Sequence, residues 1–129
     1  MIDFKDTMNN LAATRPIFHS EADFQFALSW EIKSRHPSAE VRLEWRPHQY
    51  LGIDHVDILV SIASKKIGIE LKYKTRALEC MVGNEHYILK NQSAQDIARY
   101  DYLTDISRLE SLKQEGIIKT GFAYGNNTI

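Results

Sequence analysis

The chain has 129 residues, of which 43% are apolar and 26% charged, and its formal net charge is -1. These values fit one compact domain with a single core. They exclude the strongly basic balance of a protein that binds nucleic acid over its whole surface, so any such contact would come from a local patch.

The sequence also predicts the compartment. No stretch approaches the roughly 18 to 20 apolar residues of a membrane-spanning helix. The N-terminus, MIDFKDTMNN, has acidic residues where a secretory signal has positive charge and then an apolar run. A single cysteine, Cys80, excludes an intrachain disulfide and agrees with a reducing compartment. We therefore expect a soluble, cytoplasmic protein with no membrane partner.

The first elements are helical. Residues 1–19 lack a clear pattern, so we expect an irregular N-terminal arm, with a short leading helix as the alternative. Ser20 and Asp23 have the spacing of a helix cap, and apolar residues then recur at helical spacing. Phe26 and Trp30 broaden this apolar face, which predicts a helix packed on both a sheet and a neighbour.

Strands dominate the middle of the chain. Alternating apolar residues predict three strands, at 41–45, 56–62 and 66–74. The interval 75–91 gives only one extended piece, at 86–89. A long helix then starts at a Ser93 cap and ends at Gly116, followed by a strand at 117–124. The apolar stripe of this helix comprises Ile97, Tyr100, Leu103, Ile106, Leu109 and Leu112.

Two of these strands carry charged residues in a pattern suited to chemistry. Glu70 and Lys72 are two residues apart on one strand and so share a face, and Asp57 lies on the preceding strand. Two carboxylates can hold Mg²⁺ and leave positions for water and a phosphate oxygen. Lys72 would act on that water or neutralise charge on the phosphate. A structural ion pair is the alternative, and an exposed one contributes only about 0 to 1 kcal/mol.

Asp57 followed by Glu70-Leu71-Lys72 resembles the D…(D/E)xK signature of the PD-(D/E)XK nuclease superfamily. The resemblance implies an α/β (α+β) chain with a restriction-endonuclease-like αβββαβ core, a mixed central sheet flanked by helices. It also implies that Asp57 and Glu70 bind the metal and that Lys72 assists the attacking water. Val56 stands where the family name has proline.

The resemblance covers nearly the whole chain, because the order of predicted elements is helix, three strands, helix, strand. We therefore expect residues 1–129 to form a single nuclease-like domain. Family members usually continue beyond the last strand, so the resemblance implies a minimal or C-terminally truncated version.

Further site residues follow from the resemblance. Glu21 sits where many relatives carry an additional metal-binding acid, and a helix N-terminal acid favoured by the helix dipole is the equal alternative. In exonuclease-like branches a Gln and a Tyr on the later helix border the active site. Here Gln95 and Arg99 share one helix face. We place both near the scissile phosphate, and Tyr100 in the core.

Basic and aromatic residues accompany the three strands, and such a mixture can grip a phosphate backbone and stack a base. A solvated strand face is the alternative. The set comprises Arg42, Arg46, Lys72, Lys74, Arg76, Trp45, Tyr50 and Tyr73. The five histidines show no metal-ligand spacing with cysteine or with each other, so we expect no structural zinc and mostly solvated imidazoles.

The sequence thus predicts a nuclease that uses Mg²⁺ or Mn²⁺ to hydrolyse phosphodiester bonds in DNA. Pairing of the last strand at the sheet edge would allow a homodimer. A non-catalytic module that binds nucleic acid or protein is the main alternative. An ordinary α+β domain with chance ion pairs is the third, and it would have Asp57 and Glu70 on opposite sheet faces.

Overall fold

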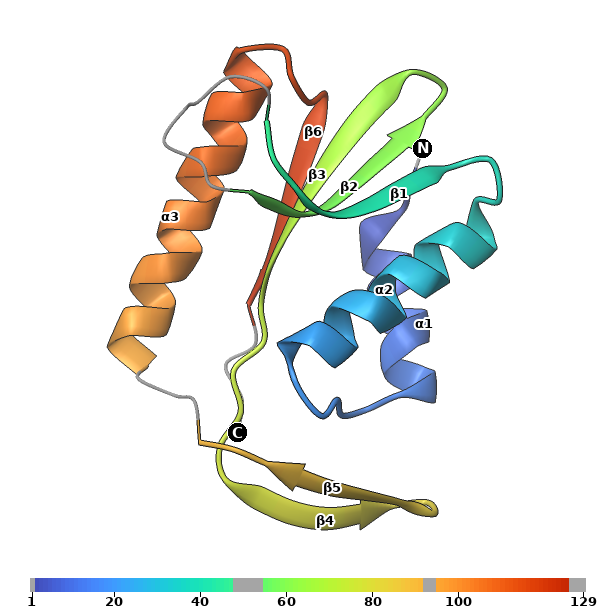
Figure 1. Ribbon diagram of the computed structural model, residues 1–129, viewed down its shortest axis with the longest axis vertical. Coiled ribbons are helices and arrows are strands. Elements are labelled where there is room, and N and C mark those ends of the chain that lie inside the picture. The colour runs from blue at the N-terminus through green and yellow to red at the C-terminus, as the bar shows by residue number, and fades with distance from the viewer. Residues whose placement is uncertain (1, 48–54, 92–94, 126–129) are drawn as a thin grey trace.

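The computed structural model describes residues 2–47, 55–91 and 95–125, and between 95 and 102 it describes the backbone alone. This part of the chain contains three helices and six strands (Figure 1). In chain order they are α1 (Phe4–Thr14), α2 (Glu21–Arg35), β1 (Glu40–Trp45), β2 (Val56–Ile62), β3 (Lys65–Lys72), β4 (Leu78–Val82), β5 (Glu85–Leu89), α3 (Gln95–Gln114) and β6 (Thr120–Gly125).

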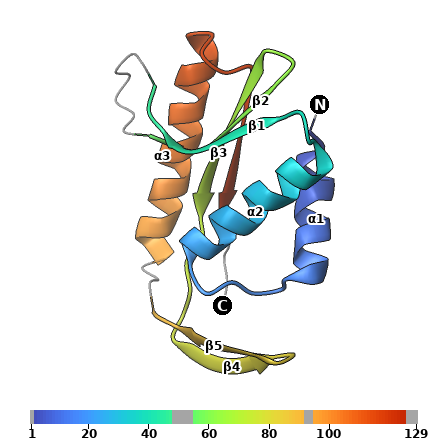
Figure 2. The same cartoon turned by 45° about the vertical axis from the view of Figure 1, so that its right-hand side comes forward.

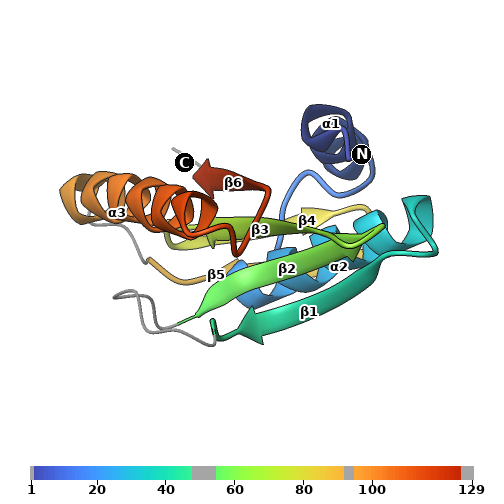
Figure 3. The ribbon, with the colours of Figure 1, turned by 90° about the horizontal axis from the view of Figure 1, so that it is seen from above.

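Four strands form a mixed sheet in the order β1-β2-β3-β6. The first three are antiparallel neighbours, and β6 runs parallel to β3 after the connection through α3. Helices α1 and α2 lie on one side of this sheet and α3 on the other (Figures 2 and 3). A mixed α/β architecture with a central sheet flanked by helices is therefore confirmed, as is the edge position of the last strand.

The predicted order of helix, three strands, helix and strand is confirmed, with two additions. The first is α1, so an irregular arm over residues 1–19 is wrong and the short leading helix is right. Asp3 caps α1 by accepting a hydrogen bond from the Asp6 N–H at 3.0 Å. Leu11 is buried against the core, and this packing holds a helix too short to persist alone.

Ser20 caps α2 as predicted, since its hydroxyl oxygen accepts the Asp23 N–H at 3.1 Å. The helix buries Phe24, Leu28 and Ile32. The helix packs on the sheet and on α1, as predicted, but Phe26 and Trp30 take no part in that packing, because they are 59% and 68% exposed. Both lie on the far side of the helix from the buried row, and their rings stack on each other with centroids 6.0 Å apart.

The second addition is the β4–β5 hairpin, which replaces the single extended piece expected at 86–89. It is inserted between β3 and α3 and lies below the sheet in Figure 1. Its turn contains Gly83 with φ +60, a conformation that glycine adopts without steric cost.

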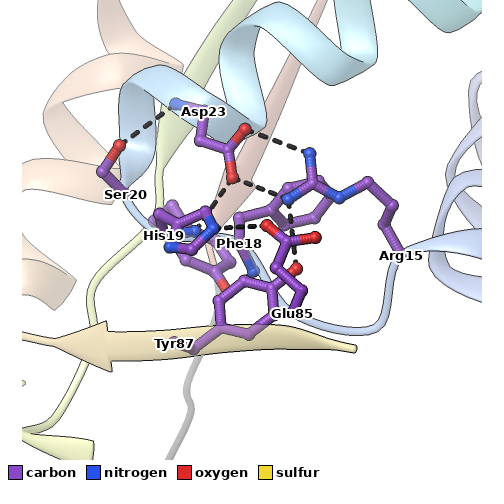
Figure 4. A network of polar contacts seen from close by, with 8 residues as sticks. Arg15, Phe18, His19, Ser20, Asp23, Glu85 and Tyr87 are labelled. Atoms are coloured by element: carbon purple, nitrogen blue, oxygen red, sulfur yellow. Dashed lines mark hydrogen bonds and ion pairs between the residues drawn. The ribbon is translucent and has the colours of Figure 1, made fainter. Parts of the chain in front are cut away.

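A polar cluster ties this hairpin to the connection between α1 and α2 (Figure 4). Arg15 donates to the two carboxylate oxygens of Asp23 at 3.0 and 2.8 Å, and also to the Tyr87 hydroxyl at 3.3 Å. The His19 ring stacks on Tyr87 with centroids 4.1 Å apart, and His19 Nε2 lies 2.5 Å from Glu85 Oε2. The hairpin is thereby held at the N-terminal end of α2.

The two faces of β3 set the position of α3. Ile67, Ile69 and Leu71 enter the core cluster that α1 and α2 cover. On the opposite face Gly68 pairs with Gly121 of β6, and a Cβ at either position would lie 3.1 to 3.2 Å from Leu109 of α3. The absence of two side chains therefore brings α3 close to the sheet.

No helix among residues 2–47, 55–91 and 95–125 combines the length and apolar character needed to cross a membrane.

Candidate metal centre

Asp57 stands where the pairing of β2 with β3 stops. The last paired residues of this ladder are Ile58 and Ile69. Beyond them the Asp57 side chain replaces a strand partner, because its Oδ2 accepts the Leu71 N–H at 2.7 Å. Gln25 of α2 donates to the Asp57 carbonyl oxygen at 2.8 Å. These two bonds fix Asp57 beside the C-terminal half of β3.

Glu70 is buried beside Asp57. Alternation along β3 turns Ile69 and Leu71 to the core and Glu70 to the face that α3 covers, where it is 3% exposed. Burial, together with the negative charges of Asp57 and Asp105, raises the pKa of Glu70 to about 9. Within the described part of the chain, Glu70 Oε1 has no hydrogen-bond partner. A buried carboxyl oxygen without a donor is costly, and either a donor or a cation would satisfy it.

Lys72 faces the same region and lies next to an acid that the sequence patterns did not single out. Lys72 Nζ is 3.6 Å from Asp105 Oδ2, which is beyond hydrogen-bonding distance but within range of an ion pair. The Asp105 side chain is 2% exposed and Lys72 is 24% exposed. Burial raises the pKa of Asp105, and the charge of Lys72 opposes that shift.

Asp105 had a signal in the sequence. It precedes Leu109 by four residues and Leu112 by seven, so it belongs to the helix row that packs on the sheet. The predicted stripe ran through Leu103 instead, and that part is wrong, because Leu103 is 59% exposed. An acid within the apolar row of a helix that packs on a sheet indicates a buried charged site.

The cluster therefore joins three carboxyl groups, Asp57, Glu70 and Asp105, to one ammonium group, Lys72. Buried like charges raise one another's pKa unless a cation compensates them. Oxygen ligands are those that Mg²⁺ and Mn²⁺ prefer. The donor set and the unpartnered Glu70 Oε1 thus fit a divalent cation held by Asp57 and Glu70. Asp57 and Glu70 lie on the same face of the sheet, whereas an ordinary α+β domain with chance ion pairs is expected to have them on opposite faces.

A histidine also reaches this edge of the cluster. His55 Nε2 lies 3.1 Å from Glu44 Oε2 and 3.2 Å from Asp57 Oδ1. One ligand atom from each of Glu44, His55 and Asp57 lies within 4.8 Å of the others. The expectation of solvated imidazoles is wrong for His55, because the spacing argument compared histidines with cysteine and with one another, and not with carboxylates on a paired strand.

The register between β1 and β2 places Glu44 next to His55 and Asp57. Leu43 pairs with Ile58 and Trp45 with Val56, so Glu44 lies across from Asp57. Glu44 has φ +53, in the left-handed region that non-glycine residues rarely adopt. This conformation interrupts the regular alternation of β1 at the residue that contacts His55.

Of the remaining predicted site residues, Glu21 and Lys74 lie near the C-terminal end of β3. Glu21 Oε2 accepts the Tyr73 N–H at 2.9 Å, so its described contact braces the chain just after Lys72. Lys74 is half-buried two residues beyond β3. Gln95 and Arg99 belong to the start of α3, but their side chains and that of Tyr100 lie outside the described residues, as does the Ser93 cap.

The site thus combines residues of β1, β2, β3 and α3 that are far apart in the sequence. Membership of the PD-(D/E)XK superfamily and the specific restriction-endonuclease-like fold both stay predictions. Comparisons of the chain with protein-family models, with curated proteins and with solved structures find no match.

Proposed function

We propose that this protein is a metal-dependent nuclease that hydrolyses phosphodiester bonds in DNA. Asp57 and Glu70 hold Mg²⁺ or Mn²⁺, and Lys72 acts beside them on the water and the phosphate. The observation that carries the proposal is the meeting of these three residues at the point where β2 and β3 stop pairing. Burial of two neighbouring acids costs folding free energy, and such acids with shifted pKa values cluster at functional sites.

The order of elements supports the fold that belongs with this activity. Helix α2, strands β1 to β3, helix α3 and strand β6 follow the αβββαβ order, and β6 runs parallel to β3. Helix α1 and the β4–β5 hairpin then count as additions to a restriction-endonuclease-like core.

Hydrolysis adds water across one P–O bond. The water oxygen attacks phosphorus, the bond to the leaving oxygen breaks, and the proton lost by the water leaves to solvent while the departing oxygen gains one. A bound divalent cation supplies polarisation of the phosphate and acidification of its water. Asp57 and Glu70 orient that cation through their carboxylate oxygens.

Lys72 acts as a cation in this scheme. The neighbouring Asp105 carboxyl favours the charged ammonium form, since the two groups lie 3.6 Å apart. An ammonium group next to the phosphate stabilises the negative charge that builds up in the transition state and orients the water. Asp105 is then a positioning residue, because it acts through Lys72.

The test is a cleavage assay on plasmid and on linear single-stranded DNA with Mg²⁺ or Mn²⁺. The Lys72→Ala variant should lose cleavage by about 100-fold or more, as for removal of one transition-state donor. Lys66→Ala is the matched control, since it removes an exposed lysine from the same strand. Equal cleavage by wild type and Lys72→Ala contradicts the proposal and points to a contaminating nuclease.

A non-catalytic nucleic-acid-binding module is the second candidate. The observation in its favour is the depth of the acids, since Glu70 is 3% and Asp105 2% exposed. A module of this kind would bind DNA in EDTA as well as in Mg²⁺ and would cleave with neither metal. Filter binding and cleavage on the same protein sample separate the two candidates.

A further inference from the structure

We propose that Glu44, His55 and Asp57 form a binding site for one transition-metal ion of the Mn²⁺, Co²⁺ and Zn²⁺ class. The site lies beside the Asp57–Glu70 pair and shares Asp57 with it. It includes a nitrogen ligand, which the two carboxylates of the proposed nuclease site do not provide. The inference goes beyond the proposed function, because metal binding here requires no cleavage of DNA.

The distances suit a shared ion. Two ligand atoms that sit about 2.0 to 2.2 Å from one metal, at roughly tetrahedral or right angles, lie about 3 to 3.5 Å apart. His55 Nε2 lies 3.1 Å from Glu44 Oε2 and 3.2 Å from Asp57 Oδ1. All three ligand atoms fall within 4.8 Å of one another. Small side-chain rotations would therefore complete the coordination.

The backbone brings these three ligands together. Antiparallel pairing sets Glu44 across from Asp57, and His55 directly precedes β2. Asp57 Oδ2 is occupied by the Leu71 N–H, so the oxygen turned toward His55 is Oδ1. One carboxylate is thus held by the sheet through one oxygen and offered to a ligand through the other.

A second observation points independently to a cation. Glu70 lies against Asp57, is 3% exposed, and its Oε1 has no hydrogen-bond partner among the described residues. An unpartnered carboxyl oxygen at this depth is costly unless a positive charge or a donor reaches it. Next to the proposed ligand Asp57, Glu70 Oε1 therefore lacks the donor or cation that its burial calls for.

The nitrogen ligand sets the class of metal. Mg²⁺ takes oxygen ligands and retains its waters, whereas imidazole suits first-row transition metals. We therefore expect Zn²⁺ and Co²⁺ to bind here more tightly than Mg²⁺. The competing explanation is a protonated His55 that pairs with both carboxylates and binds no metal.

The experiment titrates the full chain, freed of metal with EDTA and then dialysed, with Zn²⁺ and separately with Mg²⁺ in a calorimeter. The wild type should bind Zn²⁺, and both His55→Ala and Glu44→Gln should weaken that binding by at least about tenfold. His86→Ala is the matched control, because His86 Nε2 pairs with Glu79 Oε2 at 2.7 Å on the β4–β5 hairpin. This control should bind Zn²⁺ as the wild type does.

Imidazole ¹⁵N spectra give a second measurement that needs no variant. Zn²⁺ should shift the His55 Nε2 resonance and leave that of His86 in place. Unchanged Zn²⁺ affinity in Glu44→Gln, whose side chain is 61% exposed and carries no core packing, overturns the site, as does an unshifted His55 resonance.

Failure of this site and failure of the proposed nuclease are distinguishable. Lys72→Ala should retain the Zn²⁺ affinity of the wild type while it loses cleavage. A wild type that cleaves DNA but shows no His55-dependent Zn²⁺ binding refutes only the metal site. A wild type that binds Zn²⁺ through His55 and never cleaves DNA refutes only the nuclease.

Discussion

The Oδ2 atom of Asp57 accepts the backbone N–H of Leu71 at 2.7 Å, just past the last paired residues of β2 and β3. A side chain thus continues a strand pairing that the backbone has ended. The residue before Leu71 is Glu70, so the same bond sets the two acids of the candidate centre side by side.

The first prediction concerns the stability of the metal-free protein against pH. The pKa of Glu70 is raised from its ordinary value of 4.5 to about 9, so the folded chain holds a proton that the unfolded chain releases between these values. Its contribution to stability is therefore full below about pH 4.5 and declines as pH rises toward about 9.

Glu70→Gln should remove this decline, because glutamine resembles the protonated acid and cannot ionise. Relative to the variant, the wild type should lose at most about 1.4 kcal/mol of unfolding free energy per pH unit, the value for one proton. Urea denaturation in EDTA at several pH values measures the difference. Glu79→Gln, an exposed acid on β4, is the control, and parallel curves for Glu70→Gln and wild type would refute the assignment.

The second prediction concerns the contact between α3 and the sheet. A Cβ at Gly121 would lie 3.1 Å from both Cβ and Cδ2 of Leu109. Gly121→Ala should therefore push α3 outward and destabilise the protein by about 1 to 3 kcal/mol. The shift would also separate Asp105 from Lys72.

A double-mutant cycle checks that steric origin. Leu109→Ala alone leaves a cavity and should cost about 2 to 5 kcal/mol. The double variant keeps the close contact with Cβ at position 109 but removes those with Cδ1 and Cδ2, so the combined loss should be smaller than the sum of the two single losses. Strict additivity in thermal or urea unfolding would show that Gly121 acts for another reason.

The third prediction concerns the cluster in Figure 4 that ties the β4–β5 hairpin to α2. Partial burial opposes ionisation of Asp23, but hydrogen bonds from Arg15 and from the His19 N–H outweigh it and lower the pKa of Asp23 below 3.8. This stabilisation is present above about pH 3.8 and is lost as pH falls through the lowered value.

Asp23→Ala should destabilise the protein by about 1 to 3 kcal/mol at neutral pH, since it removes a two-point bond from Arg15. It should also raise amide hydrogen exchange in β5, because Arg15 would no longer be held near Tyr87. Glu40→Gln is the control. It breaks the exposed Glu40–Arg42 ion pair, which contributes about 0 to 1 kcal/mol to the free energy of unfolding. Equal effects of the two substitutions would argue against the tether.

Local patterns were sufficient for the elements whose own residues decide their form. Alternation along β3 turned Glu70 and Lys72 to one face, and the Ser20 cap fixed the start of α2, because both depend on neighbours in the chain. The helical character of α1 was harder to assign, since burial of Leu11 supplies much of its stability.

Contacts between distant segments were beyond such patterns. The approach of Glu44 and His55 to Asp57 depends on the register between β1 and β2, and this register cannot be read from the sequence alone. Asp105 reaches Lys72 only because α3 lies close to the sheet. Phe26 and Trp30 matched an apolar face, yet exposure of large apolar side chains is decided by what else is available to cover them.

The facing glycines of β3 and β6 have one more consequence. Neither residue has a side chain to shorten, so the smallest change at Gly68 or Gly121 inserts a whole carbon beneath Leu109. Any substitution at these glycines would therefore shift α3, and with it the burial of Asp105, by about the size of a methyl group.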